Sequence, residues 1–355
     1  MTMTAVGSIN TSENGRPAYA WEAMDDATLL QLRICDLGLQ LNDSSVQPKI
    51  RQLYQELKEK GIHFHPACYL TTEWLCPDRV PLIGIPFCLA HPRLTKLEHT
   101  MMLEVEGGSD KACMQLLRHE MGHAINYAYH LYRRTRWRDL FGPISQEYNV
   151  SEYYPRPYSR QFVEHLPGNY AQAHPDEDFA ETFAVWLTPH FDWRRKYRGR
   201  HALKKLEYVD HLMADIGDRP PQVSGGRKLW PLKRVRSTLA HYYKNKRVAF
   251  GEDFPGYYDP FLNQFFTHKI QDTRGPASKW LSKNRRNIIQ HIASGARLRK
   301  YQVDVVLKKL IHRSKELQLH LNDSDESTLL KISIALTAML CEDRFREDFL
   351  HGEED

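Results

Sequence analysis

The chain has 355 residues, of which 41% are hydrophobic and 26% charged, a balance typical of a folded globular protein and not of a disordered or fibrous one. This length accommodates a catalytic domain followed by a helical extension. No apolar run approaches the roughly 18 residues of a membrane-spanning helix, and residues 1–23 lack the basic and apolar regions of a secretory signal. We therefore expect a cytoplasmic protein with a flexible N-terminal tail over residues 1–23.

The six cysteines are scattered along the chain, and no C-x-x-C pair occurs among them. This pattern indicates neither a zinc ribbon nor a dense disulfide framework. We expect reduced thiols, most of them buried.

Two helices are predicted after the tail, over residues 25–37 and 46–60, because apolar residues recur there at three- and four-residue spacing. Residues 62–106 differ from them. They contain short β-branched and aromatic stretches broken by prolines, which indicates a small sheet leading to a strand over residues 101–105.

The following helix is predicted over residues 110–132. Its apolar residues form one continuous stripe, so His119 and His123 face a second surface of the helix. Residues 133–169, rich in Arg, Tyr and Pro, indicate an irregular segment over the mouth of a site. Another helix is expected to begin near residue 175 and to end by Pro189.

The run from His119 to His123 reads HEMGH and carries the chemistry. Two histidines one helical turn apart can both reach one ion, at about 2.0–2.1 Å from each ring nitrogen. Glu120 can then accept a proton from a water that zinc has acidified. The motif also arises by chance, and the same residues would suit a solvated helix face. The interpretation as a metal site therefore needs support from a third ligand.

Glu177 and Glu181 are the best candidates for that support, because their spacing puts both on one face of the predicted helix. We assign Glu177 to the metal, whereas Glu181 holds a ligand histidine by its free ring N–H and so fixes its tautomer. An exposed acidic first turn, favoured by the helix dipole, would explain the same two residues without any metal.

Two histidines compete for the third position. His130 lies two turns beyond His123, about 10 Å along the helix axis, so the helix would have to break between them. Asn126 stands where the histidine-ligated class has a turn-forming glycine. His174 suits a cap or turn before Pro175 better than it suits a ligand.

A hydrolytic site also needs a donor for the oxyanion that forms at the attacked carbonyl. Tyr170 is the candidate, although a packed aromatic at a helix entrance would explain it equally well. Three tyrosines of the irregular segment remain rivals for this role: Tyr148, Tyr153 and Tyr154.

The runs LRHEMGH, from Leu117 to His123, and HPDEDFAETFA, from His174 to Ala184, resemble the bacterial putative zinc-binding metallopeptidase family. The resemblance extends more loosely over most of the chain, including residues 104–108 and 203–210. That family is similar in its core to the gluzincins and, in motif order, to the catalytic domain of anthrax lethal factor.

The resemblance implies a set of roles for particular residues: His119, His123 and Glu177 as ligands of one zinc ion, Glu120 as the base, Glu181 as support for a ligand and Tyr170 as the oxyanion donor. It implies hydrolysis of a peptide or related amide bond. Some members carry an N-terminal zinc ribbon, but this sequence lacks the cysteines for it. We therefore expect one catalytic zinc ion and no second, structural one.

The expected architecture is α+β and predominantly helical. A zincin-like metallopeptidase domain, with a small N-terminal sheet and active-site helices, would cover residues 24–217. A Pro-Pro and Gly-Gly stretch then suggests a boundary, beyond which a helical extension would run over residues 218–340 and an acidic tail over residues 341–355.

Residues 191–250 contain sixteen Lys or Arg and five acidic residues, with aromatic residues among them. A peptide or protein substrate is the expected partner of the catalytic site. The basic stretch raises a second hypothesis, binding of nucleic acid, while a solvated basic face that docks an acidic segment explains it as well. A catalytically silent zinc scaffold is the third hypothesis. The aromatic residues in question are Trp193, Tyr197, Trp230, Tyr242 and Tyr243.

Overall fold

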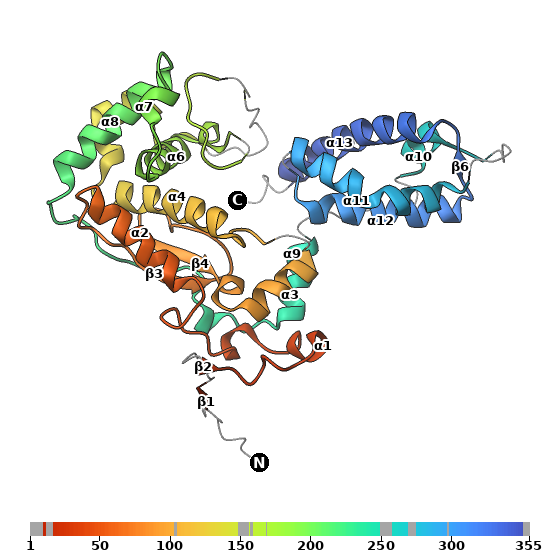
Figure 1. Ribbon diagram of the computed structural model, residues 1–355, viewed down its shortest axis with the longest axis horizontal. Coiled ribbons are helices and arrows are strands. Elements are labelled where there is room, and N and C mark those ends of the chain that lie inside the picture. The colour runs from red at the N-terminus through yellow and green to blue at the C-terminus, as the bar shows by residue number, and fades with distance from the viewer. Residues whose placement is uncertain are drawn as a thin grey trace. The chain divides into compact units, whose positions relative to one another are not determined.

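The structure is a computed structural model of the chain. It describes residues 10–11, 17–102, 105–147, 156, 159–167, 169–248, 258–268, 275–296 and 298–350. The chain divides into two compact units. The first comprises Met1–Met101 and Val105–Tyr242, and the second comprises Met102–Glu104 and Tyr243–Asp355. The predicted architecture, predominantly helical with small sheets, is confirmed (Figure 1).

Helices are the main regular structure in the described part of the first unit, which also holds the first residues of α9. Their bounds are α1 (Asp26–Leu29), α2 (Gln47–Glu59), α3 (Pro92–Met102), α4 (Asp110–Ala128), α5 (Thr135–Phe141), α6 (Pro175–Leu187), α7 (Trp193–Lys196), α8 (His201–Ile216) and α9 (Leu239–Val248). Short 3-10 helices cover Ile34–Asp36, Phe87–Ala90, Leu131–Arg133, Tyr170–Gln172 and Leu232–Arg234. The helices predicted over residues 46–60 and 175–189 are thereby confirmed.

The expected small sheet consists of two parallel strands, β3 (Ala67–Thr71) and β4 (Leu82–Pro86). On the other side of β4, Leu75 forms an isolated antiparallel bridge to Gly84. All five residues of β4 are buried, so protein covers both faces of this strand. The sheet and α2 lie on one side of α4, and α6 lies on the other (Figure 1).

Two predicted elements are wrong. Residues 25–37 do not form one helix, because the N–H groups of Ile34 and Cys35 bond to the carbonyl groups of Ser237 and Val235 instead of continuing a helical ladder. The strand expected over residues 101–105 is also not observed, since α3 runs to Met102.

The second error has a clear sequence cause. The buried residues Leu94, Leu97, Glu98 and Met102 recur with the three- and four-residue spacing of one helix face and not with the alternation of a strand. Residues 103 and 104 lie outside the described part of the chain, so the rest of the predicted strand is not observed either way.

The expected tail over residues 1–23 ends earlier than predicted. Asn10–Thr11 and Pro17–Ala18 pair as the antiparallel strands β1 and β2. Trp21 is only 4% exposed, and its indole N–H donates to the carbonyl oxygen of Leu37 at 2.9 Å. A buried indole with a satisfied N–H anchors the chain at Trp21, within the stretch expected to be a flexible tail.

The segment over residues 133–169 is not entirely irregular, because it contains α5. Trp137 and Phe141, one turn apart on that helix, are buried and both contact the ring of Phe179 in α6. Residues 148–155, 157–158 and 168 lie outside the described part.

The two units divide between Tyr242 and Tyr243, later than the boundary that we expected at residue 218. The chain beyond the Pro-Pro stretch stays tied to the first unit. The N–H of Ala240 donates to the carbonyl oxygen of Leu30 at 2.8 Å, and the hydroxyl of Tyr69 contacts Leu229.

The second unit is mainly helical, in agreement with the helical extension expected from the sequence. Its elements are α10 (Asp259–Phe265), β5 (Phe266–Thr267), α11 (Ala277–Ala296), α12 (Lys300–Glu316), β6 (His320–Leu321) and α13 (Asp325–Leu350). Residues of α12 and α13, among them Val303, Leu307, Ile332 and Leu336, contribute to one buried core. The backbone of α13 continues to Leu350, through most of the stretch expected to be an acidic tail. Among the described residues, no helix combines the length and apolar character needed to cross a membrane.

Candidate metal centre

Beyond its first turns, helix α4 is enclosed by protein on all sides. The hydroxyl of Ser109 caps it by accepting from the N–H of Ala112 at 3.2 Å, and every residue from Leu116 to Ala128 is buried. His119 and His123 face a second surface, as predicted, but that surface is packed against α6 and not exposed to solvent. His119 is 3% exposed. A solvated helix face is therefore ruled out for this motif.

Helix α6 begins with the cap predicted for it. The ring nitrogen Nδ1 of His174 accepts from the N–H of Asp176, and Pro175 occupies the first turn. Glu181 is completely buried, and the side chain of Glu177 is only 14% exposed. The exposed acidic turn that the sequence left open is thus excluded, because these carboxylates face α4.

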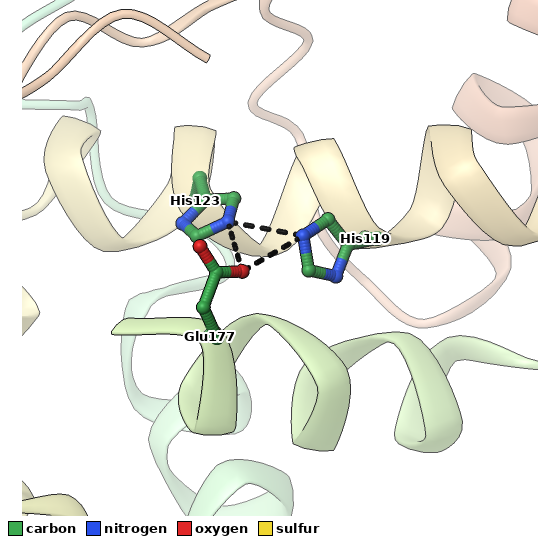
Figure 2. A group of neighbouring side chains, drawn as sticks. All are labelled: His119, His123 and Glu177. Carbon is green, nitrogen blue, oxygen red and sulfur yellow. Dashed lines mark hydrogen bonds and ion pairs between the residues drawn. The ribbon is translucent and has the colours of Figure 1, made fainter. Parts of the chain in front are cut away.

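Three side chains converge between the two helices (Figure 2). The Nε2 atoms of His119 and His123 lie 3.1 Å apart, and Oε2 of Glu177 lies 3.1 Å and 3.2 Å from them. Donors held tetrahedrally at about 2.0–2.1 Å from zinc lie about 3.3 Å apart, so the spacing suits one such ion. These residues could hold a metal ion.

The other ring nitrogens of both histidines meet carboxylates of α6. Nδ1 of His119 lies 2.9 Å from Oε1 of Glu181, and Nδ1 of His123 lies 3.1 Å from Oδ2 of Asp176. In each case the carboxylate accepts the Nδ1–H of the ring. The lone pair of the ring is then on Nε2, which faces the space between the three donor atoms. Two nitrogen donors and one carboxylate with these tethers fit a zinc ion.

Asp176 is the site residue that the sequence prediction missed. Besides His123, it accepts from the amide of Asn126 at 2.7 Å and from the hydroxyl of Tyr127 at 2.5 Å. The signal available in the sequence was its position next to Glu177, in the first turn of the same helix. That signal is weak, because an acidic residue is common at a helix start.

The comparisons with known proteins bear on this segment. Residues 109–192 match a family described as "Putative zinc-binding metallo-peptidase". No curated protein and no solved structure matches the chain. The match to this zinc-binding family runs from the cap of α4 past the end of α6, so it contains every residue of the convergent cluster.

The charges of the cluster favour a cation. Burial lowers the pKa of His119, but its hydrogen bonds to Glu177 and Glu181 prevail and raise the pKa to about 9. Burial raises the pKa of Glu177, but His123 and His119 have the larger effect and hold this pKa well below its usual range. The attraction between the carboxylates and the imidazoles is thus stronger than the cost of burying charge. The cluster therefore favours a positive charge, carried either by protons or by a metal ion.

Glu120 and Tyr170 border this cluster. Glu120 is buried, and burial raises its pKa although the neighbouring histidines act in the opposite sense. The ring of Tyr170, in a 3-10 helix before α6, lies 5.5 Å from the ring of His119, measured between centroids. The three rival tyrosines, Tyr148, Tyr153 and Tyr154, lie outside the described residues.

The alternative third ligands lie elsewhere. His130 follows the end of α4 in a left-handed conformation, with φ of 49°, and its Nδ1 lies 2.8 Å from the side-chain oxygen of Gln222. His174 caps α6, and its Nε2 lies 2.8 Å from the carbonyl oxygen of Gln146. Neither belongs to the convergent cluster.

Two buried ion pairs support the helices from outside the cluster. Arg118 of α4 donates to both carboxylate oxygens of Glu56 in α2, at 2.7 Å and 2.8 Å. Asp178 of α6 accepts from Lys205 of α8 at 2.5 Å. Arg118 precedes His119 in the sequence, and Asp178 follows Glu177. Both pairs therefore help to set the positions of α4 and α6 next to the convergent cluster.

Proposed function

We propose that this protein is a zinc-dependent metallopeptidase that holds one zinc ion through His119, His123 and Glu177. Its reaction would be hydrolysis of a peptide or closely related amide bond. The observation that carries the proposal is the convergence of three donor atoms within 3.2 Å of one another, with both histidines tethered by carboxylates at Nδ1. The match of residues 109–192 to a zinc-binding metallo-peptidase family supports it.

Zinc bound by this set would supply Lewis acidity, lowering the pKa of a water to around 7 and polarising the substrate carbonyl. Glu120 is our candidate for the general base. Its burial raises the pKa of its carboxyl, and a raised pKa improves a carboxylate as a proton acceptor near neutral pH. It would later return this proton to the leaving amine.

Glu181 and Asp176 would act by positioning. By accepting the Nδ1–H of His119 and of His123, they keep both rings in the tautomer that directs Nε2 inward. Glu181 also accepts from the backbone N–H of Leu166 at 2.8 Å, which ties the segment before Tyr170 to α6. Tyr170 is our candidate donor to the oxyanion of the attacked carbonyl.

We also assign the first unit to the zincin-like fold and to its gluzincin type. The support is the third donor, a glutamate on a second helix, together with a second glutamate one turn later. The same order of motifs underlies the similarity to the lethal factor catalytic core.

Metal content tests the ligand set. The purified wild-type protein is expected to hold one zinc ion, measured by elemental analysis, and H123A and E177A are expected to lose most of it. H130N is a matched control, because it removes a histidine close in sequence to the site and places an asparagine where the left-handed conformation is tolerated. Equal zinc in all four proteins would rule out the assignment.

Turnover tests the enzymatic reading separately. E120Q is expected to keep its zinc and to lose activity against an unbiased peptide library by on the order of a hundredfold or more. A wild-type protein that binds zinc but cleaves no peptide, with a biological function unchanged by E120Q, would instead identify a silent scaffold.

A further inference from the structure

A long stretch of the chain, most of it at the end of the first unit, carries only positive charge. From residue 219 to residue 251 the chain contains nine Lys or Arg and no Asp or Glu. Five of these cations and one tryptophan fall within residues 227–236, which we call the basic segment. The proposed peptidase chemistry uses none of them. The cations are Arg227, Lys228, Lys233, Arg234 and Arg236.

All five cations of the basic segment are exposed. Within the part of the chain that the structure describes, none of them lies within 4.0 Å of a carboxylate oxygen. Other cations of residues 191–250 do have carboxylate partners, since Arg219 pairs with Asp215 and Arg194 pairs with Asp210. The positive charge of the segment is therefore not neutralised locally and is available to an anionic partner.

Trp230, in the middle of the basic segment, is 55% exposed. Its backbone has φ of 42°, in the left-handed region that bulky residues avoid. Neither feature helps the fold, because an exposed indole gains little from burial and the backbone conformation costs energy. A strained residue that persists on a surface points to a binding role.

Strand β3 holds Trp230 in this position. The hydroxyl of Tyr69 accepts from the N–H of Leu229 at 3.1 Å and lies at the same distance from its carbonyl oxygen. The hydroxyl of Thr71 is 3.3 Å from the carbonyl oxygen of Leu229 and 3.0 Å from that of Trp230. The backbone of Leu229 and Trp230 is thus fixed to two buried residues of β3.

Trp230 is the most exposed of the large aromatic side chains described in the basic stretch, since Phe191 is only 38% exposed. Trp193, Tyr197 and Tyr243 are buried, and the hydroxyl of half-buried Tyr242 lies 3.1 Å from the carbonyl oxygen of Thr72. The broad hypothesis of nucleic-acid binding over residues 191–250 therefore narrows to the segment around Trp230.

We propose that the basic segment binds single-stranded nucleic acid, with a base stacked on Trp230 and the flanking phosphates bound by the lysines and arginines. Every base presents an aromatic face, so an exposed indole fixed among cations suits an unpaired strand of any sequence. An acidic polypeptide would use the cations but would leave the rigid indole without a function.

Fluorescence anisotropy with labelled oligo(dT) and oligo(U) of about 20 nucleotides tests the proposal on the full-length, zinc-loaded protein. Wild-type protein is expected to bind at least one probe, and comparison of the two distinguishes DNA from RNA. Affinity should fall steeply with salt. K233Q/R234Q should lower the slope of log affinity against log salt by about 1.4 if each cation contacts a phosphate, whereas the matched change K196Q/R198Q on exposed residues outside the segment should not.

Substitutions of Trp230 separate binding from folding. W230G relieves the backbone strain, so its Tm should equal or exceed that of the wild type, yet its affinity should fall on the order of tenfold. W230F should retain most of the binding, because a phenyl ring still stacks. The proposal is overturned if neither probe binds at low salt, if W230G binds as tightly as the wild type, or if polyglutamate binds in preference to both probes.

Discussion

Gly122 of α4 packs directly against Ala180 of α6. A Cβ atom on residue 122 would stand 2.6 Å from the Cα atom of Ala180 and 2.8 Å from its carbonyl oxygen, closer than such atoms approach in real proteins. The neighbours in sequence are His123 and Glu181, so the glycine sets the separation of two helices at the point where their side chains meet. The absence of a side chain is the structural requirement at this position.

We predict that G122A lowers both stability and zinc affinity. The added methyl group meets backbone atoms, which cannot move aside as a flexible side chain can, and overpacking of this kind costs about 1–3 kcal/mol. Thermal unfolding and competition with a zinc-binding dye measure the two effects. G295A is the control, because Gly295 in α11 is exposed and has open space around it. That variant should gain about 0.5–1 kcal/mol, and a similar gain for G122A would contradict the prediction.

The carboxylates that hold the histidines should control metal affinity. We predict that D176N and E181Q each weaken zinc binding by about 10- to 100-fold while the protein stays folded, because the ligand rings lose a charged acceptor at Nδ1. Dissociation constants come from dye competition, and circular dichroism checks the fold. D139N makes the same chemical change as D176N at an exposed position of α5, so it should bind zinc like the wild type. Wild-type affinity in D176N and E181Q would show that the two carboxylates only fill space.

The buried pair of Glu56 and Arg118 should be costly to break. E56Q leaves the guanidinium of Arg118 buried without a carboxylate, which is expected to lower the free energy of unfolding by about 3–5 kcal/mol in urea titrations. E56L/R118M removes both charges and should recover much of this loss. For comparison, D36N breaks an exposed pair with Arg33 and should change stability little. Equal losses in E56Q and D36N would be inconsistent with this view.

The stability of the first unit should depend on the protonation of His165. Burial lowers the pKa of this imidazole, Glu181 and the carbonyl of Gln115 act against it, and His119 and Arg118 lower it further. Its Nε2 lies 2.9 Å from the carbonyl oxygen of Gln115, so the folded protein holds the neutral ring with hydrogen on Nε2.

Because the pKa is lower in the folded than in the unfolded protein, the unfolded chain binds the extra proton first as the pH falls. The contribution of His165 is complete above about pH 6.5 and declines below it, by at most about 1.4 kcal/mol per pH unit. H165Q cannot titrate but can still donate to Gln115. We expect the wild type to lose stability relative to H165Q below pH 6.5 in paired urea titrations. Parallel pH profiles would refute the prediction, since all other titrating groups are shared.

The elements of the cluster could be predicted from the sequence because their geometry is local. The four-residue spacing of His119 and His123 fixes their common helix face whatever the rest of the chain does, and the same holds for Glu177 and Glu181. The cap at His174 and the stop at Pro189 bound the second helix. What remained open was whether the two faces meet, and only tertiary packing decides that.

The missed features depend on partners that are distant in sequence. The chain around Ile34 gives up helical hydrogen bonds for the carbonyl groups of residues near 235, some two hundred positions away. Asp176 gains its role because its partners His123, Asn126 and Tyr127 lie on another helix. The late division between the units has the same origin, since β3 and residues near 30 hold the chain after its Pro-Pro stretch.

In the convergent cluster both imidazoles belong to α4 and the carboxylate of Glu177 belongs to α6. An ion bound by the three side chains would therefore cross-link the two helices as well as take part in the chemistry. A ligand that binds only the folded form adds about 4 kcal/mol when its concentration is a thousand times its dissociation constant. The abundance of this protein in a cell would then follow the supply of the ion, because cellular proteases degrade molecules that open. Metal starvation would turn a proposed protein-cutting enzyme into a target for others.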